Sequence, residues 1–243
     1  MIKDDFTKFA RDKGVTTSMV DDYAKHVESS LTPYILEERE MRVTQMDIFS
    51  RMMSDRILWV YGGVDDRMSS IVNAQLMFLD NLDEKTIKMY IDSPGGSVAS
   101  GLSMVSIMDY VKSDIATTNM GTCASMGSVL VSSGTKGLRS SLMYAKVMTH
   151  MVSHGSQGNV QDTRINQMEA EKYNYLLFKR LARNCDKSFD EIFEISRNDR
   201  WFNSDEAVKI GLIDEVIGSE NNTISNELDG FDEYYKKEVL DKM

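Results

Sequence analysis

Apolar and polar positions follow two different spacings between residues 56 and 152. Short apolar runs such as Arg56–Tyr61 are typical of buried strands. The stretch 68–82 instead carries apolar residues at 68, 71, 72, 76 and 79, which is the spacing of one helix face. Strands are predicted at 56–61, 86–91, 115–120 and 146–152, and helices at 68–82, 98–111 and 125–133. This alternation predicts an α/β fold built from βαβ units.

The second half of the chain continues with helices that carry capping signals. Residues 161–185 predict a long helix with apolar positions at 165, 168, 176, 177 and 181. Ser188 with Glu191 predicts a capping box for the next short helix. Asn203 and Glu206 cap another helix, which Gly211 ends before a strand predicted at 212–217.

The two ends of the chain differ from this central pattern. Residues 1–30 form a charge-mixed head, compatible with short helices at 4–13 and 18–28. Residues 219–243 form a tail with seven acidic and three basic residues and few aliphatic ones, which predicts a flexible appendage. We therefore divide the chain into a head (1–30), a central domain (31–218) and an acidic tail (219–243).

Composition narrows the classes of function. Of 243 residues, 28 are Lys or Arg and 38 are Asp or Glu, a net charge of −10, so nucleic acid and anionic membranes are not expected partners. No apolar run approaches the roughly 20 residues of a membrane helix, and the first residues lack a signal-peptide core. We expect a cytoplasmic protein. Two cysteines without CxxC or HExxH spacing predict neither a disulfide framework nor a metal site.

The segment Ser93-Pro-Gly-Gly-Ser97 lies between a predicted strand and a predicted helix. Paired glycines there allow backbone N–H groups to point outward and a substrate to approach closely, as an oxyanion hole requires. A simple turn without chemistry is the alternative reading of this segment alone.

A second strand-to-helix junction, Gly121-Thr-Cys-Ala-Ser-Met-Gly127, contains a candidate nucleophile. Ser125 would lie beside a helix N-terminus, where the next N–H and the helix dipole favour an oxyanion. The segment does not match G-x-S-x-G, and a serine at this place is also a common helix cap.

A serine nucleophile needs a base, and the chain has only His26, His150 and His154. His150 lies at the end of a predicted strand, which makes it the better candidate. Asp199, between two capped helices, is the candidate acid, favoured only weakly over Asp190.

Taken together, these residues resemble the Clp peptidase family. The resemblance covers residues 31–218, and the head is similar to that of ClpP chains from Bacteroides-like bacteria. Ser-to-His and His-to-Asp separations of 25 and 49 positions also match. The matching motifs are Thr32-Pro-Tyr-Ile-Leu-Glu-Glu-Arg39, Val43-Thr-Gln-Met-Asp-Ile-Phe-Ser-Arg51, Ser93-Pro-Gly-Gly96, Ala124-Ser-Met-Gly127, Lys146-Val-Met-Thr-His150, Asn198-Asp-Arg-Trp-Phe202 and Glu206-Ala-Val-Lys-Ile-Gly-Leu-Ile-Asp214.

The resemblance implies a serine endopeptidase with Ser125 as nucleophile, His150 as base and Asp199 as the orienting acid. Gly96 and Met126 would supply the oxyanion-hole N–H groups. It also implies a crotonase-like spiral of βαβ units with a projecting handle helix, and two stacked heptameric rings joined by a handle loop near 156–158. No cofactor or metal is implied; unfolded polypeptide would be the substrate, delivered by a separate ATP-driven unfoldase of the AAA+ class.

Several positions depart from the family pattern. His150-Met-Val152 replaces the usual His-Gln-Pro, His154 replaces a common glycine, and Asn198 replaces an arginine that commonly links the rings. The apolar pocket that binds the unfoldase would contain Tyr90, Tyr110, Met120 and Leu142, but also the polar Lys88, Thr118 and Ser140. We interpret the chain as a divergent paralogue with altered partner docking or ring pairing, which could work beside a second ClpP.

Two other functions compete with the peptidase. One is a catalytically weak or silent scaffold subunit of a mixed Clp ring: the retention of all three triad residues argues against it, whereas Met151-Val152 leaves it open. An acyl-CoA hydratase or isomerase would share the fold but usually relies on carboxylate bases. The presence of Ser125 together with His150 argues against the hydratase or isomerase.

Overall fold

The computed structural model describes residues 34–39, 42–155, 157–218 and 223–238, and it divides the chain into two units, Met1–Arg56 and Ile57–Met243. In the first unit, β1 (Tyr34–Arg39) pairs antiparallel with β2 (Arg42–Asp47), and α3 (Ile48–Ser54) follows. The Asp47 carboxylate caps α3 by accepting the Ser50 N–H at 3.0 Å. The helices predicted at 4–13 and 18–28 lie outside the described residues.

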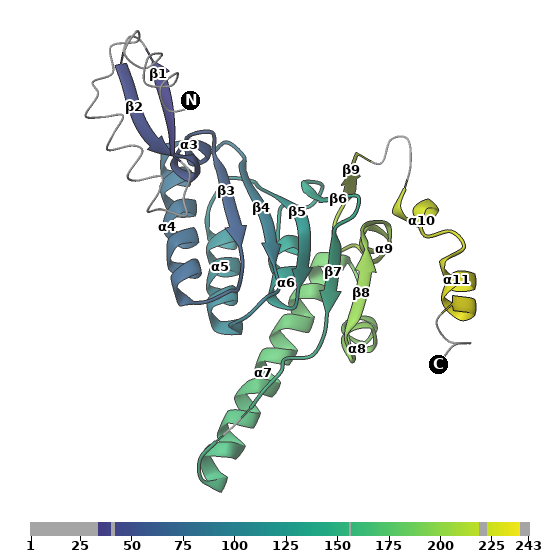
Figure 1. Cartoon of the computed structure of the whole chain (residues 1–243). Helices are drawn as coiled ribbons and strands as arrows, with labels where there is room; N and C mark the ends of the chain where they lie inside the picture. Colours follow the sequence, from purple (N-terminus) through teal and green to yellow (C-terminus); the bar gives the residue numbers. More distant parts are fainter. Residues whose placement is uncertain (1–33, 40–41, 156, 219–222, 239–243) are drawn as a thin grey trace, which may run out of the picture. The chain divides into compact units, whose positions relative to one another are not determined.

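The second unit is built on a mostly parallel seven-stranded sheet (Figure 1). The strands β3, β4, β5, β6 and β9 follow one another in parallel order. Their bounds are β3 (Ile57–Tyr61), β4 (Ile87–Ser93), β5 (Ile115–Ala124), β6 (Arg139–Leu142), β7 (Lys146–Thr149), β8 (Arg200–Asn203) and β9 (Glu215–Ile217). The predicted mixed α/β class is confirmed, whereas β6 and β8 were not predicted.

Among the helices of this unit, α8 and α9 begin at the two capping boxes that the sequence predicts. The bounds are α4 (Asp66–Leu82), α5 (Val98–Tyr110), α6 (Met126–Ser132), α7 (Val160–Cys185), α8 (Phe189–Ser196) and α9 (Ser204–Ile210). Both capping boxes form, and Gly211 ends α9 with a φ of +92°. α4 buries a stripe of Ser69, Val72, Leu76 and Leu79. Every residue of α6 is buried, as expected of a helix inside the core.

The sheet divides at β5, because the two halves of this strand have different partners. Thr117–Asn119 pair with β6, whereas Thr122–Ala124 pair with β7. β8 then adds to β7 in antiparallel direction. The C-terminal end of β5 therefore lies beside β7, away from β6.

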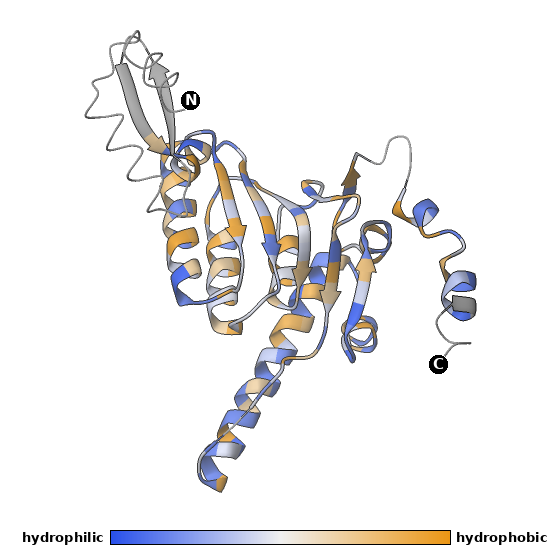
Figure 2. Ribbon diagram, viewed as in Figure 1, coloured by the Kyte–Doolittle hydropathy of each residue, from blue (hydrophilic) through white to orange (hydrophobic). Residues whose placement is uncertain are grey.

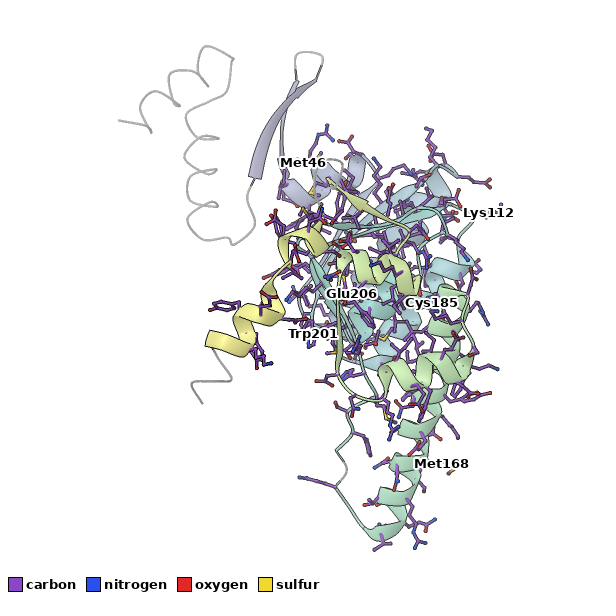
Figure 3. All side chains as sticks on the ribbon, turned by 90° about the vertical axis from the view of Figure 1, so that its right-hand side faces the viewer. Met46, Lys112, Met168, Cys185, Trp201 and Glu206 are labelled. Atoms are coloured by element: carbon purple, nitrogen blue, oxygen red, sulfur yellow. The ribbon has the colours of Figure 1, made fainter. Side chains whose placement is uncertain are left out.

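The long helix α7 joins the body only through its C-terminal half. Figure 1 shows its N-terminal part extending away from the sheet, as predicted for a handle, and Figure 2 shows mostly polar residues there. Val160 and Met168 on that part are more than half exposed, whereas Phe178 and Leu181 are buried. Figure 3 labels Met168 and Cys185 on the two parts of the helix.

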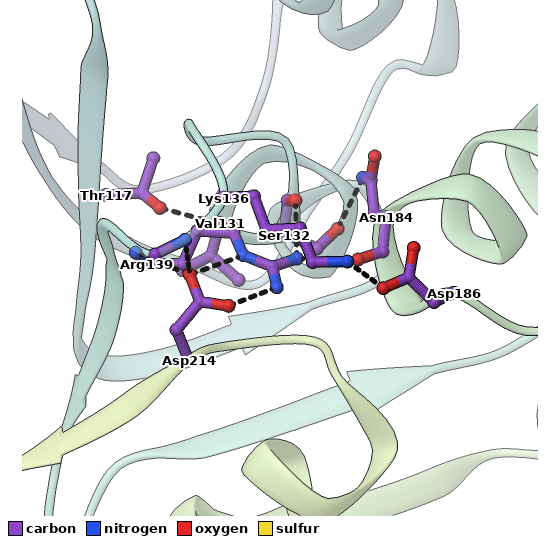
Figure 4. A network of polar contacts seen from close by, with 9 residues as sticks. Thr117, Val131, Ser132, Lys136, Arg139, Asn184, Asp186 and Asp214 are labelled. Atoms are coloured by element: carbon purple, nitrogen blue, oxygen red, sulfur yellow. Dashed lines mark hydrogen bonds and ion pairs between the residues drawn. The ribbon is translucent and has the colours of Figure 1, made fainter.

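A buried ion pair fixes the C-terminal end of α7 to the sheet (Figure 4). The Arg139 guanidinium pairs with Asp214 and donates to the backbone carbonyls of Asn184 at 2.8 Å and Ser132 at 3.3 Å. Arg139 is only 2% exposed. One cation thus connects the ends of α6 and α7 with the segment that leads into β9. Removal of either partner would leave an unpaired charge that is wholly or partly buried, which is costly.

The tail contains two short helices, α10 (Ile224–Glu227) and α11 (Phe231–Glu238). The N–H and hydroxyl of Ser225 both donate to the carboxylate of Asp205, at 2.9 and 2.7 Å. Burial alone would raise the pKa of Asp205, but the hydrogen bonds from Ser225 hold it below its usual value. This contact joins α10 to the first turn of α9.

Candidate active site

Ser125 lies between β5 and α6 in a conformation that few residues other than glycine adopt. Its φ is +54° and its ψ is −121°, while α6 begins at the next residue, Met126. The Ser125 N–H donates to the Met148 carbonyl of β7 at 2.9 Å. Strained backbone of this kind is found at nucleophile turns, where it exposes the hydroxyl. Its Oγ accepts no hydrogen bond from the N–H groups of its own helix.

His150 directly follows β7 and faces this hydroxyl. The Nε2 atom of His150 lies 2.9 Å from Oγ of Ser125, which is hydrogen-bond distance. The register of the parallel pair brings the two together, because Ala124 pairs with Met148 and each strand ends within one residue of that point. The predicted strand at 146–152 is wrong in its length, since β7 ends at Thr149.

The other nitrogen of His150 faces Asp199. The distance from Nδ1 to Oδ1 of Asp199 is 3.3 Å. β8 starts at the next residue and pairs Arg200 with Thr149, which places residue 199 next to residue 150. Asp190, the alternative acid, instead lies in the first turn of α8. The imidazole thus stands between a hydroxyl and a carboxylate.

The glycine turn lies against the same serine. An added Cβ on Gly95 would come within 2.7 Å of the Ser125 Cβ and 2.8 Å of the Met126 nitrogen. On Gly96 it would come within 2.3 Å of the Val64 carbonyl oxygen. Both glycines have positive φ, +90° and +150°, so side chains are excluded by conformation and by contact. Gly95 therefore allows the turn to approach Ser125 closely, and Gly96 allows it to pair with Val64.

The Ser93 side chain holds the turn from inside. Its hydroxyl donates to the Gly62 carbonyl at 2.6 Å and accepts the Gly95 N–H at 3.1 Å. Val64 and Gly96 form an isolated parallel bridge, in which the Val64 N–H donates to the Gly95 carbonyl. The Met126 N–H stands at the first position of α6 and so lacks an acceptor within the helix.

A cavity of about 220 Å³ opens beside Ser125 and His150. Gly96 and Met126 line it as well, so the five residues predicted from the sequence meet in one region, with Asp199 behind the imidazole. Its apolar wall comes from α5, α6 and α7, through Val98, Val129, Leu177, Phe178 and Leu181. This wall was not predicted from the sequence, although the apolar stripe of the helix predicted at 161–185 contains Leu177 and Leu181.

Neither cysteine offers a competing nucleophile. Cys123 is fully buried, and burial raises the pKa of its thiol well above the usual range. Burial likewise raises the pKa of Cys185 to about 11. His154 is exposed, His26 lies outside the described residues, and so does Ser156 of the predicted handle loop.

The described residues contain no group of three or more His, Cys, Asp or Glu side chains that could hold a metal ion. Within the same residues, no helix is both long and apolar enough to cross a membrane.

Comparison with known proteins shows the family of the chain. The profile of the Clp protease family matches residues 38–220. The chain belongs to the Clp protease family. It is 42% identical over 216 residues to the ATP-dependent Clp protease proteolytic subunit of Bacteroides fragilis strain YCH46, covering 88% of this chain and 98% of that one. The proteolytic subunits of Bacteroides thetaiotaomicron (88% and 98% covered) and Porphyromonas gingivalis (88% and 97%) are 41% and 37% identical. Membership of this protease family and the likeness to Bacteroides chains were both predicted from the motifs.

Proposed function

We propose that this Clp family member is a serine endopeptidase in which Ser125 is the nucleophile, His150 the general base and Asp199 the orienting acid. The supporting observation is the row of contacts from Oγ to Nε2 at 2.9 Å and from Nδ1 to Oδ1 at 3.3 Å. A base within hydrogen-bond reach of the nucleophile, itself oriented by a third group, is the arrangement that acyl transfer requires.

In the proposed reaction, Ser125 Oγ attacks the carbonyl carbon of the scissile bond while its proton passes to Nε2 of His150. The N–H groups of Gly96 and Met126 stabilise the oxyanion, because they lie next to the nucleophile and need no reorganisation. Nε2 then returns the proton to the leaving amine as the C–N bond breaks. Water, deprotonated by the same imidazole, hydrolyses the acyl-enzyme and releases the serine.

The cavity predicts a preference for apolar side chains on the acyl side of the cleaved bond. Its wall of Leu177, Phe178 and Leu181 offers no charge to a Lys or Glu side chain. With fluorogenic peptides that differ only at this residue, we expect Leu or Met to exceed Glu in kcat/KM by about 100-fold, because burying an unpaired charge is costly. Equal rates for Leu and Glu would show that the residue binds elsewhere.

We also propose that the chain works in stacked heptameric rings, on unfolded polypeptide supplied by an AAA+ unfoldase or together with a second ClpP.

Two of the polar positions in the expected docking pocket are less unfavourable for binding of the unfoldase than the sequence suggests. Thr118 and Ser140 are buried and hydrogen-bond each other at 2.9 Å, so they satisfy their own polar groups. Lys88 is exposed. The reduced docking of an ordinary unfoldase would then depend chiefly on Lys88.

The scaffold alternative is less well supported, because a silent subunit gains nothing from a strained serine held within hydrogen-bond distance of an imidazole. A hydratase or isomerase would need a carboxylate base at the cavity, and no Asp or Glu lines the described cavity.

A fluorophosphonate probe tests the proposal, since it phosphonylates a serine only when a neighbouring base activates it. We expect the wild-type protein to be labelled at Ser125 and the Ser125→Ala variant to remain unlabelled. Labelled wild type that also cleaves peptides supports the peptidase. A wild type that assembles normally but stays unlabelled would favour the scaffold subunit.

A further inference from the structure

The segment that follows β7 carries the imidazole and lines the cavity, yet it lies outside the sheet. Residues 150–155 have no strand pairing, because β7 ends at Thr149. His150, Val152 and Ser153 from this segment line the cavity beside Ser125. The position of the imidazole therefore depends on whatever holds these few residues.

The structure describes one hydrogen bond from the backbone of residues 151–155 to another part of the described chain. The Val152 N–H donates to the Asn174 side-chain carbonyl, Oδ1, at 2.7 Å, and the contact is partly buried. At the opposite end of the segment, Thr149 is fixed by pairing with Arg200 and by the Ser196 hydroxyl at 3.1 Å. His150 thus lies between a fixed strand end and the contact from Asn174.

Asn174 lies on the part of α7 that is anchored to the body. It stands three, four and seven positions before Leu177, Phe178 and Leu181, so all four occupy one helix face, and the last three form the cavity wall. The end of this helix is held by the buried Arg139 through the Asn184 carbonyl. A side chain at position 174 is therefore attached to a rigid element and can fix a loop.

We propose that Asn174 is a positioning residue that holds the segment carrying His150 through the Val152 N–H. This inference rests on the proposed peptidase function and extends it. Position 152 is a proline in the usual His-Gln-Pro pattern, and proline has no N–H to donate. The acceptor at position 174 can therefore form this hydrogen bond only when another residue, such as valine, occupies position 152. The hydrogen bond thus does for Val152 what a fixed proline ring would do: it restricts the backbone next to the base.

A double-mutant cycle tests the proposal in the full-length protein. Asn174→Leu keeps the size of the side chain but removes the acceptor, and we expect kcat/KM for a fluorogenic peptide to fall about tenfold, because small misplacements of a catalytic group are costly. Val152→Pro removes the donor, so in that background Asn174→Leu should cost less than about twofold. Asn174→Asp keeps an acceptor and should retain most of the activity. Glu171→Leu, at an exposed position of the same helix, is the matched control.

The fluorophosphonate probe separates positioning from peptide binding. The probe carries no peptide, so an equal tenfold slowing of Ser125 labelling in Asn174→Leu would locate the effect at the imidazole. A labelling rate equal to wild type, or the same loss of kcat/KM with and without Val152→Pro, would overturn the proposal while leaving the peptidase intact. Wild type that is not labelled at all would overturn both. If Asn174→Leu lowers the melting temperature, the activities of Asn174→Leu and Asn174→Asp are compared well below that temperature, where both variants are folded. A lower activity of Asn174→Leu under these conditions still supports the proposal, and equal activities overturn it.

Discussion

A His150→Ala variant is expected to lose at least about 10⁴-fold in kcat, because His150 is the one base within hydrogen-bond distance of the Ser125 hydroxyl among the described residues. Nε2 of His150 is the hydrogen-bond partner that the structure describes for Oγ of Ser125. Without it, the serine proton has no acceptor and the leaving amine has no donor. Single-turnover hydrolysis of a fluorogenic peptide measures this loss in the chemical step, without a contribution from the rate of product release.

The components of the site should also act as a unit. The Ser125→Ala/His150→Ala double variant should be no slower than either single variant, since each alone already disables the same step. Asp199→Asn should lose less than His150→Ala, because its carboxylate is 70% exposed and only orients the ring. His154→Ala, on an exposed imidazole nearby in sequence, should keep wild-type activity. A larger loss of activity in His154→Ala than in His150→Ala would show that the base is His154 and not His150.

An Arg139→Met variant should lower the free energy of unfolding by about 3–5 kcal/mol. The substitution removes the cation from Asp214 and leaves the carbonyls of Ser132 and Asn184 without their donor. Because Arg139 is almost fully buried, water cannot take over these contacts without opening the core. Denaturant unfolding of the assembled protein, at fixed protein concentration, measures the change.

Two controls separate this ion pair from ordinary surface pairs. Lys172→Met removes the exposed partner of Glu169 and should change stability little. Arg139→Met/Asp214→Leu, which leaves no unpaired charge, should recover part of the loss. If Arg139→Met lowered the free energy of unfolding as little as Lys172→Met does, the pair of Arg139 and Asp214 would contribute no more to stability than a surface pair.

The same pair makes stability depend on acid pH. Burial alone would raise the pKa of Asp214, but hydrogen bonds and charge from Arg139 hold it below the usual 3.8. A carboxylate with a lowered folded-state pKa stabilises the protein above its unfolded pKa, and this stabilisation is lost as pH falls through the lower, folded value. The wild type should therefore lose more stability below pH 4 than Arg139→Met does.

The sequence predicted the elements whose signals are local. The two capping boxes start α8 and α9 as the residue spacing indicates, whereas the Asp65 cap of α4 was not predicted and this helix begins two residues earlier than expected. β6 and β8 were missed because each has only four residues, and Arg139 and Arg200 give them no apolar alternation. The β1–β2 hairpin was missed for a similar reason, since its strands contain charged residues at their joined ends.

The candidate site was predicted in its residue types, and the geometry adds what spacing cannot provide. Asp199 was only weakly favoured over Asp190, because the choice depends on the antiparallel pairing of β8 with β7, a contact between distant segments. The contact from Asn174 to Val152 has no sequence signal, since asparagine in mid-helix is usually a solvent-exposed side chain. Both features arise from tertiary contacts that no local pattern encodes.

The division of the sheet at β5 has a consequence for control of this protein. The proposed nucleophile and base follow adjacent strands joined by backbone ladder bonds, from Thr122 with Lys146 to Ala124 with Met148. These bonds hold the backbones next to Ser125 and His150 together, whereas the imidazole itself lies one residue beyond the end of β7. Under the proposed mechanism, control of proteolysis would act on the exposed carboxylate of Asp199, on the segment that follows β7, or on the access of substrate to the Ser125 hydroxyl.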